Sequence, residues 1–372
     1  MELINATRMV AGYTMGRDPA GRESLVVVVK GTFALPAAGE TEVRLHDEQL
    51  PLELADSHTG EPGRSAPLRE IDFAPKKTAC DVLLTGSACA PAGREATQVE
   101  VGLRVGPVNK RCEVVGDRRW EAGLTGIRAS RPQSFSRQPV SYDVAFGGVD
   151  AASDDPADHA AFGPNPVGRG FHKKLKSAWV DGRPMPNTQE IGRPVSWPSD
   201  AYAPMAFGPL GRHWSQRAAY AGTYDQRWLD EDYPFLPRDF DARYFQAAPV
   251  DQQIPLPIKA PLEVVLTNFT PDGQRAFVLP YLEAPLHVFP RRGPRQDHLA
   301  LLDTIAFETD AQRFTMTWRA SLPLRRNMFE ISQVLVGRKG REWWQQRSEA
   351  RFPIPVVMVP MPRDPASSDL AA

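Results

Sequence analysis

Hydrophobic positions gather into short, strand-like patterns in the first third of the chain. Residues 24–35 hold a continuous β-branched run, as in a strand buried on both faces, and residues 79–90 are a second candidate. Residues 99–105 alternate apolar and polar side chains. A second strand-like segment, residues 111–115, follows after a loop of four or five residues. Together the two segments predict a β-hairpin.

The last third repeats this pattern. Two hairpin signals stand out, each a pair of β-rich segments around a short turn. Their segments are 262–268 with 275–279, and 302–308 with 313–319. Residues 328–336 and 355–359 are further strand candidates, and residues 338–350 form the best helix signal outside the middle.

Between these ends, from about residue 128 to 260, regular periodicity mostly disappears. Nearly half of the 36 prolines lie here, and proline is excluded from helix interiors and central strands. A loop of this length in a compact domain is unusual. However, the segment is also rich in aromatic residues, which each bury about 150–250 Å² and which a disordered linker lacks. We therefore expect an ordered irregular layer over a β core, with a short helix around residues 214–220.

The predicted fold is mainly β. We expect antiparallel β-sandwich-like sheets, a long ordered middle rich in Pro, Gly and aromatic residues, and few short helices. The regions are 1–127 (N-terminal, β-rich), 128–260 (irregular layer), 261–362 (C-terminal, β-rich) and 363–372 (disordered tail). The sequence leaves open whether the two β-rich ends form one composite domain or two small ones.

Composition narrows the class of protein. Hydrophobic residues make up 42% and charged residues 24%, as in globular domains, and the net charge of −1 favours neither nucleic acid nor an anionic membrane as partner. No apolar run reaches 18 residues, and the first residues lack a signal-peptide pattern. Three cysteines without framework spacing argue against a secreted disulfide fold. We predict a cytoplasmic protein.

Motifs that carry chemistry are absent from the sequence. No two of the seven His lie within five residues, and there is no H-E-x-x-H, C-x-x-C or G-x-S-x-G pattern. Lys30–Gly31–Thr32 resembles the end of a P-loop but lacks the preceding glycine, and Gly168–Arg169–Gly170 follows no predicted strand. Cys80 and Cys89 lie in apolar, strand-like surroundings, where a thiol is inert. We therefore predict no catalytic residue, no metal and no cofactor.

Carboxylates in the middle region leave one alternative open. They are Asp225, Asp230, Glu231, Asp232, Asp239 and Asp241. Pairs of carboxylates near aromatic rings suggest a carbohydrate-active or carbohydrate-binding β protein. The other interpretation is that these side chains accept hydrogen bonds from loop N–H groups and pair with neighbouring arginines.

Aromatic residues, arginines and carboxylates of the middle region are also the candidates for a partner-binding surface. Trp and Arg are favoured anchors of protein interfaces. The candidates are Trp214, Arg217, Tyr224, Trp228, Asp239 and Asp241, with Arg118 and Trp120 beside the predicted hairpin. The alternative is structural: these residues fasten the irregular layer to the core, and an arginine packs over a tryptophan at a sheet end.

A series of longer segments occurs in a recognisable order along the chain. They include VVVVKGTF (Val26–Phe33), APKKTACDVLLTGSACAP (Ala74–Pro91), SYDVAFGG (Ser141–Gly148), FGPLGRHWSQRAAYAGTYDQRW (Phe207–Trp228) and LPRDFDARYFQAAPVDQQ (Leu236–Gln253). Over nearly its whole length the chain resembles a bacterial domain-of-unknown-function family encoded beside type VI secretion genes.

This resemblance implies a function. Members of the family look like adaptors or chaperones that bind a toxic effector in the producing cell and help load it onto the secretion spike. The implied partners are a secreted effector and a spike protein, and the family supplies no catalytic residues. The expected function is therefore that of a non-enzymatic adaptor, and the sequence does not indicate its oligomeric state.

Overall fold

The structure is a computed structural model that describes residues 1–18, 20–123 and 126–350. Two units are described separately. The first runs from Met1 to Gly337, and the second starts at Arg338 and contains helix α4 (Arg341–Ala350). The predicted helix at 338–350 is thus confirmed. The predicted strand at 355–359 and the predicted tail at 363–372 lie outside the described residues.

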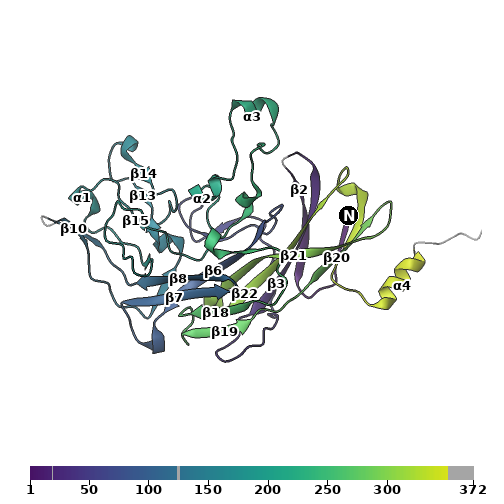
Figure 1. Ribbon diagram of the computed structural model, residues 1–372, viewed down its shortest axis with the longest axis horizontal. Coiled ribbons are helices and arrows are strands. Elements are labelled where there is room, and N and C mark those ends of the chain that lie inside the picture. The colour runs from purple at the N-terminus through teal and green to yellow at the C-terminus, as the bar shows by residue number, and fades with distance from the viewer. Residues whose placement is uncertain (19, 124–125, 351–372) are drawn as a thin grey trace, which may run out of the picture. The chain divides into compact units, whose positions relative to one another are not determined.

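The larger of the two main sheets in the first unit has ten strands (Figure 1). Seven follow one another in the order β1 (Glu2–Asn5), β23 (Ile331–Val336), β20 (Ala284–Pro290), β21 (Gln296–Glu308), β22 (Arg313–Pro323), β3 (Glu23–Ala34) and β2 (Val10–Arg17). Strand β6 (Ala79–Cys89) joins by pairing in parallel with β21, and it carries β11 (Arg137–Val140) and β17 (Gln253–Pro255) on its other side. The remaining neighbours, except β1 with β23, are antiparallel.

The second main sheet has five antiparallel strands. Their order is β16 (Thr188–Gln189), β8 (Val108–Val115), β7 (Gln98–Val105), β18 (Glu263–Thr267) and β19 (Gln274–Val278). Both hairpins predicted for this region form, but the loop between β7 and β8 has two residues and not four or five. Gly106 takes the positive φ of 52° that such a tight loop needs at its first position.

Alternate residues of the two sheets face each other and bury one core. Leu25, Val27 and Val29 of β3 lie opposite the inner face of the smaller sheet, where Val101 and Leu103 of β7 are equally inaccessible. Because each sheet places one set of alternate side chains in a shared core, the architecture is a β-sandwich, as predicted. The outer face of β3 is also covered, since Val26 and Val28 have no exposed surface.

Strands from both β-rich ends of the chain pair directly. Strand β3 pairs with β22 along its whole length, and β7 pairs with β18. Across the described part of the chain, no helix combines the length and apolar character needed to span a bilayer.

The middle of the chain forms an irregular layer with small local elements. Its helices are α1 (Ser177–Val180), α2 (Ser215–Ala218) and α3 (Gln226–Glu231), so the helix predicted around residues 214–220 is confirmed. The minor strands of the fold are β4 (Ser57–His58), β5 (Pro67–Arg69), β9 (Trp120–Gly123), β10 (Gly126–Ala129), β12 (Phe146–Gly147), β13 (Val149–Asp150), β14 (Ala160–Ala161) and β15 (Arg169–Gly170). Glycines permit close packing here, because a Cβ on Gly147 would lie 2.1 Å from the Asn165 carbonyl oxygen.

Candidate partner-binding surface

Four of the predicted partner-binding residues are buried. Trp214 is 1% exposed and meets the Tyr142 ring edge-on at 5.0 Å. Arg217 is 2% exposed, donates to the main-chain oxygens of Leu210 and Tyr244, and pairs with Glu70 at 2.5 Å. As placed here, neither side chain is accessible to a partner. Their burial supports the structural alternative, in which they fasten the irregular layer to the core.

Arg118 and Trp120 are enclosed in the same way. Trp120 has no exposed surface, and its indole Nε1 donates to the Gly170 carbonyl at 3.0 Å. The Arg118 guanidinium donates to the Gln189 side-chain oxygen at 3.0 Å and to the Pro186 carbonyl. Trp120 therefore ties β9 to β15, and Arg118 ties the segment after β8 to the residues around β16. The Gly168–Arg169–Gly170 segment belongs to this packing.

Tyr224 and Trp228 lie instead on a projection of residues 220–241, which we call the arm. It carries α3 at its tip, away from the two sheets (Figure 1). Trp228 packs edge-on against Tyr224 and Tyr233, with ring centroids 4.8 and 5.6 Å away, and its indole donates to the Phe235 carbonyl. The two outer rings of this cluster face solvent, with Tyr224 and Tyr233 exposed by 54% and 65%, and Leu229 of α3 is also 53% exposed.

Carboxylates of the arm hold its loops. Asp225 accepts from the Trp228 N–H and so caps the N-terminus of α3. Asp239 accepts from the main-chain N–H and the hydroxyl of Thr223, and these bonds lower its pKa. Asp241 accepts from Arg243, which lowers the pKa of that carboxyl too.

Asp239 and Asp241 differ from the acid of a glycoside hydrolase in one respect. Glycoside hydrolysis requires one carboxyl with a raised pKa to act as the acid. The pKa values of Asp239 and Asp241 are shifted in the opposite direction, and both side chains are engaged by loop groups. The interpretation as loop hydrogen-bond acceptors therefore describes them better, while their role toward a partner stays a prediction.

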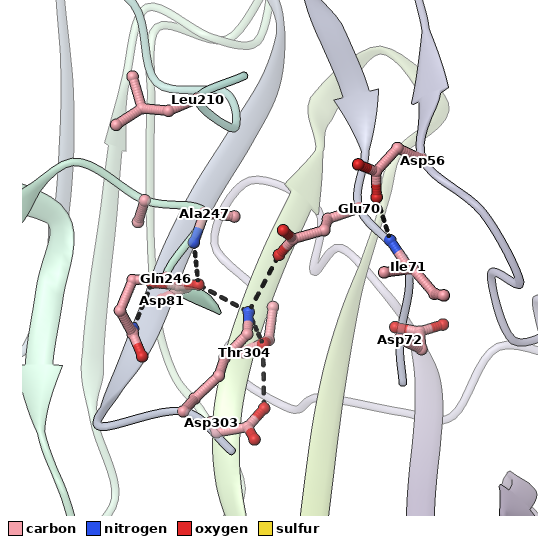
Figure 2. Close-up of polar contacts among 12 residues, drawn as sticks. Asp56, Glu70, Ile71, Asp72, Asp81, Leu210, Gln246, Ala247, Asp303 and Thr304 are labelled. Atoms are coloured by element: carbon pink, nitrogen blue, oxygen red, sulfur yellow. Dashed lines mark hydrogen bonds and ion pairs between the residues drawn. The ribbon is translucent and has the colours of Figure 1, made fainter. Parts of the chain in front are cut away.

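A buried ionic cluster lies where the arm joins the sheets (Figure 2). The Lys77 ammonium lies 2.6 Å from Asp81 and 3.6 Å from Glu70, and it donates to the Thr304 hydroxyl at 3.0 Å. Asp81, on β6, has no exposed surface. Burial acts to lower the pKa of Lys77, but the surrounding carboxylates outweigh it, so the net shift is upward.

Both ends of the arm are fixed to this cluster. On the side that leads into the arm, Arg217 reaches Glu70. On the side that leads out, the Gln246 side chain and the Ala247 N–H each donate to Asp81 at 2.8 Å. The arm therefore rises from anchored points, although its tip is open to solvent.

Further buried pairs extend the cluster across the outer face of the larger sheet. Arg319 of β22 pairs with Asp303 at 2.6 Å, and Lys30 of β3 pairs with Asp72 at 2.8 Å. Burial raises the pKa of Asp303 in spite of the nearby cations. Because Lys30 sits inside a strand and is paired, the Lys30–Gly31–Thr32 segment is not a phosphate-binding loop. A small cavity of about 50 Å³ remains between these side chains.

The sequence carries a signal for this cluster. Lys30, Asp81 and Arg319 are single charged residues in otherwise uncharged strand segments, VVVVKGTF, CDVLL and TMTWR. A charge at such a position is seldom buried without a partner. Glu70, in contrast, lies in a loop with no pattern that marks it.

The three cysteines of the chain lie in the core of the structure. Cys80, Cys89 and Cys112 are free and buried, and burial raises the pKa of Cys112 to about 12, which disfavours the reactive thiolate. Within the part of the chain that the structure describes, no three His, Cys, Asp or Glu side chains gather in a group suited to a metal ion.

A groove of about 790 Å³ lies beside the arm. One wall is the base of the arm, with Leu236 and Phe240, and the opposite wall is the outer face of β21 and β22, with Leu299 and Leu301. The arm also reaches the β2–β3 hairpin, where the Phe235 ring packs against Gly21. The surface available to a partner thus combines an aromatic projection with an adjoining, partly apolar groove.

Comparison with known proteins identifies one relationship. The sequence pattern of a family described as "Uncharacterized protein conserved in bacteria (DUF2169)" matches residues 20–319. No curated protein and no solved structure matches the chain.

Proposed function

This chain belongs to the bacterial DUF2169 family, and on that premise we propose that it is a non-enzymatic adaptor or chaperone for a type VI secretion effector. In this role it binds the effector in the bacterial cytoplasm and helps load it onto the secretion spike. The secretion context rests on the resemblance of the ordered sequence segments. The general role of a binding protein rests on the arm.

The observation that carries the proposal is the exposed aromatic surface of the arm. Tyr224, Leu229 and Tyr233 present apolar side chains to solvent on one projection. Contiguous exposed apolar surface marks interaction sites, and aromatic residues are enriched at interface cores. Anchoring of both arm ends at Glu70 and Asp81 supports the proposal further, because a surface ordered before binding loses less conformational entropy when the partner docks.

Co-purification is the direct test. The full-length protein, tagged, should retain the effector encoded beside it and the spike protein, and deletion of its gene should lower secretion of that effector. If no complex forms and secretion is unchanged, the proposal fails. Binding of soluble polysaccharides in place of the effector would favour the carbohydrate alternative.

Two variants assign the binding to the arm. The change Leu229→Ala together with Tyr233→Ala removes exposed side chains only, so folding should persist while effector binding weakens. Phe329→Ala is the matched control, because Phe329 is 69% exposed and lies outside the arm in the turn before β23. Equal loss of binding in both variants would speak against a specific role of the arm.

A further inference from the structure

Two strands of the larger sheet separate where they border the groove. The ladder between β21 and β22 ends at the pair Leu301 and Arg319, although β21 extends back to Gln296 and β22 continues to Pro323. Beyond that pair, β21 is bonded only to β20 and β22 only to β3 within the described structure. We call the two unpaired edges, residues 296–300 and 320–323, the seam.

The main-chain groups of β21 that face the seam follow from the alternation of an antiparallel ladder. The Gly337 N–H, directly after β23, donates to the Pro285 carbonyl oxygen. The main-chain carbonyl of Pro285 therefore points toward β23. The next residue, Leu286, therefore bonds toward β21, where its partner is His298. Since neighbouring residues alternate, the N–H and C=O of Leu299 point the other way, into the seam.

The same reasoning applies to β22. The Leu324 N–H donates to the Glu23 carbonyl, so Leu324 and Leu322 bond toward β3. The N–H and C=O of Ser321 consequently face the seam from the opposite side. Leu299 and Ser321 would form the next bonded pair if the ladder continued, so each strand leaves main-chain donors and acceptors without a strand partner.

The side chains around the seam add two features. Leu299 and Leu301, two residues apart on β21, share its outer face and are 48% and 41% exposed. Charged residues lining the groove include five Lys or Arg but only three Asp or Glu. Among the described residues, no carboxylate lies within ion-pair distance of Lys76, which is exposed at the groove wall. The other four cations are paired: Arg17 with Glu23, Arg22 with Asp18, Lys77 with Asp81 and Arg319 with Asp303. The groove thus offers apolar contacts at alternate positions and one exposed lysine, Lys76.

We propose that the seam binds an extended segment of the partner polypeptide by strand addition. The segment has apolar side chains at alternate positions and an acidic residue toward Lys76. Main-chain hydrogen bonds supply affinity in this mode, and alternate side chains supply specificity. The free edges accommodate four or five residues, or roughly 13–17 Å of extended chain. The identity of the partner as an effector rests on the proposed function, whereas the binding mode does not.

Proline variants test the mode, because proline removes one main-chain donor and is tolerated at a strand edge. The double variant Leu299→Pro with Ser321→Pro removes both N–H groups that face the seam. Its matched control, Leu299→Ala with Ser321→Ala, keeps them. The probe is a phage-displayed library of random peptides of about 12 residues, selected on the full chain. Selected peptides should bind the proline variant about tenfold or more weakly than the alanine control.

Hydrogen–deuterium exchange on the wild-type protein tests the same binding mode without the proline variant, in case that variant does not fold. In the free wild-type protein, the amides of Leu299 and Ser321 should exchange rapidly, and a selected peptide should protect them. Slow exchange in the free protein, binding that ignores the proline changes, or failure of the library to yield any seam-dependent peptide would each overturn the proposal.

Co-purification of the effector with the proline variant distinguishes the strand-addition mode from the proposed adaptor function. If the effector co-purifies with the proline variant as well as with wild type, the adaptor role stands and the seam mode falls. If peptides protect the seam but neither effector nor spike protein co-purifies, the strand-addition mode stands and the adaptor role falls.

Discussion

The Lys77 ammonium and the Asp81 carboxylate lie 2.6 Å apart, and both side chains are shielded from water. The two residues are four positions apart in sequence, where the chain enters β6. Asp81 also accepts hydrogen bonds from Gln246 and Ala247, which are more than 160 positions away along the chain. One carboxylate thus connects the start of a central strand with the return of the arm.

Removal of this carboxylate should destabilise the whole first unit. In the Asp81→Ala variant, the Lys77 charge stays buried without its closest partner, which typically costs about 3–5 kcal/mol. Urea unfolding followed by circular dichroism measures the loss. Glu42→Ala is the control, because Glu42 pairs with Arg44 at the surface, where ion pairs contribute little. Similar unfolding midpoints for the two variants would contradict the importance of the cluster.

The arm should loosen before the sandwich does when its outgoing anchor is cut. The Gln246 side chain donates to Asp81 and the Ala79 carbonyl and accepts from Thr78, so Gln246→Ala removes several anchoring bonds at once. We expect faster amide exchange across residues 220–241 with little change in β7 and β22. Gln226→Ala, which removes only a bond to Asp230 within α3, should leave the arm base unchanged.

Stability should fall at acidic pH, in part through Glu308. Burial acts to raise its pKa, but Arg69 and Arg313 outweigh this effect and hold the pKa below the ordinary value of 4.5. The folded state therefore binds this proton more weakly than the unfolded chain, and its stabilising contribution is lost as the pH drops below about 4.5. The free energy of unfolding of wild type and Glu308→Gln should converge between neutral pH and pH 3. A constant difference would refute this assignment.

Trp214 and Tyr224 should respond in opposite ways to truncation. Trp214→Ala opens a cavity beside Tyr142 and should cost about 3–5 kcal/mol of stability. Tyr224→Ala removes an exposed ring, so thermal stability should be nearly unchanged while effector binding weakens. Calorimetry and a pull-down with each purified variant separate the two effects. Normal binding by Tyr224→Ala would remove this residue from the partner surface.

Local patterns were sufficient to predict much of the fold. The hairpins β7–β8 and β18–β19 follow from alternation and turn residues, which act between neighbouring segments. The parallel pairing of β6 with β21 does not follow from local patterns, because more than 200 residues separate the strands and no local signal specifies a distant partner. Strand 328–336 starts only at Ile331, since Asn327 accepts from the Phe329 N–H and holds a short 3₁₀ turn in front of it.

The candidate site was predicted less well than the fold. Trp214 and Tyr224 belong to the same aromatic-rich stretch, yet one is buried and the other is 54% exposed. Residue type alone does not separate them, because an aromatic ring stabilises a core and an interface by the same apolar burial. The seam has no sequence signal for a different reason: it depends on where a strand ladder stops, which no residue pattern marks.

Anchoring both ends of the arm at one buried cluster also makes the arm modular. Its entry at Arg217 and its exit at Gln246 are fixed by residues of the scaffold, Glu70 and Asp81. Loops whose ends are held in this way tolerate changes in length and sequence between them. Under the proposed adaptor role, changes at the tip of the arm would alter the choice of partner while the sandwich that bears the arm keeps its fold, and exchange of the arm between family members would redirect the protein.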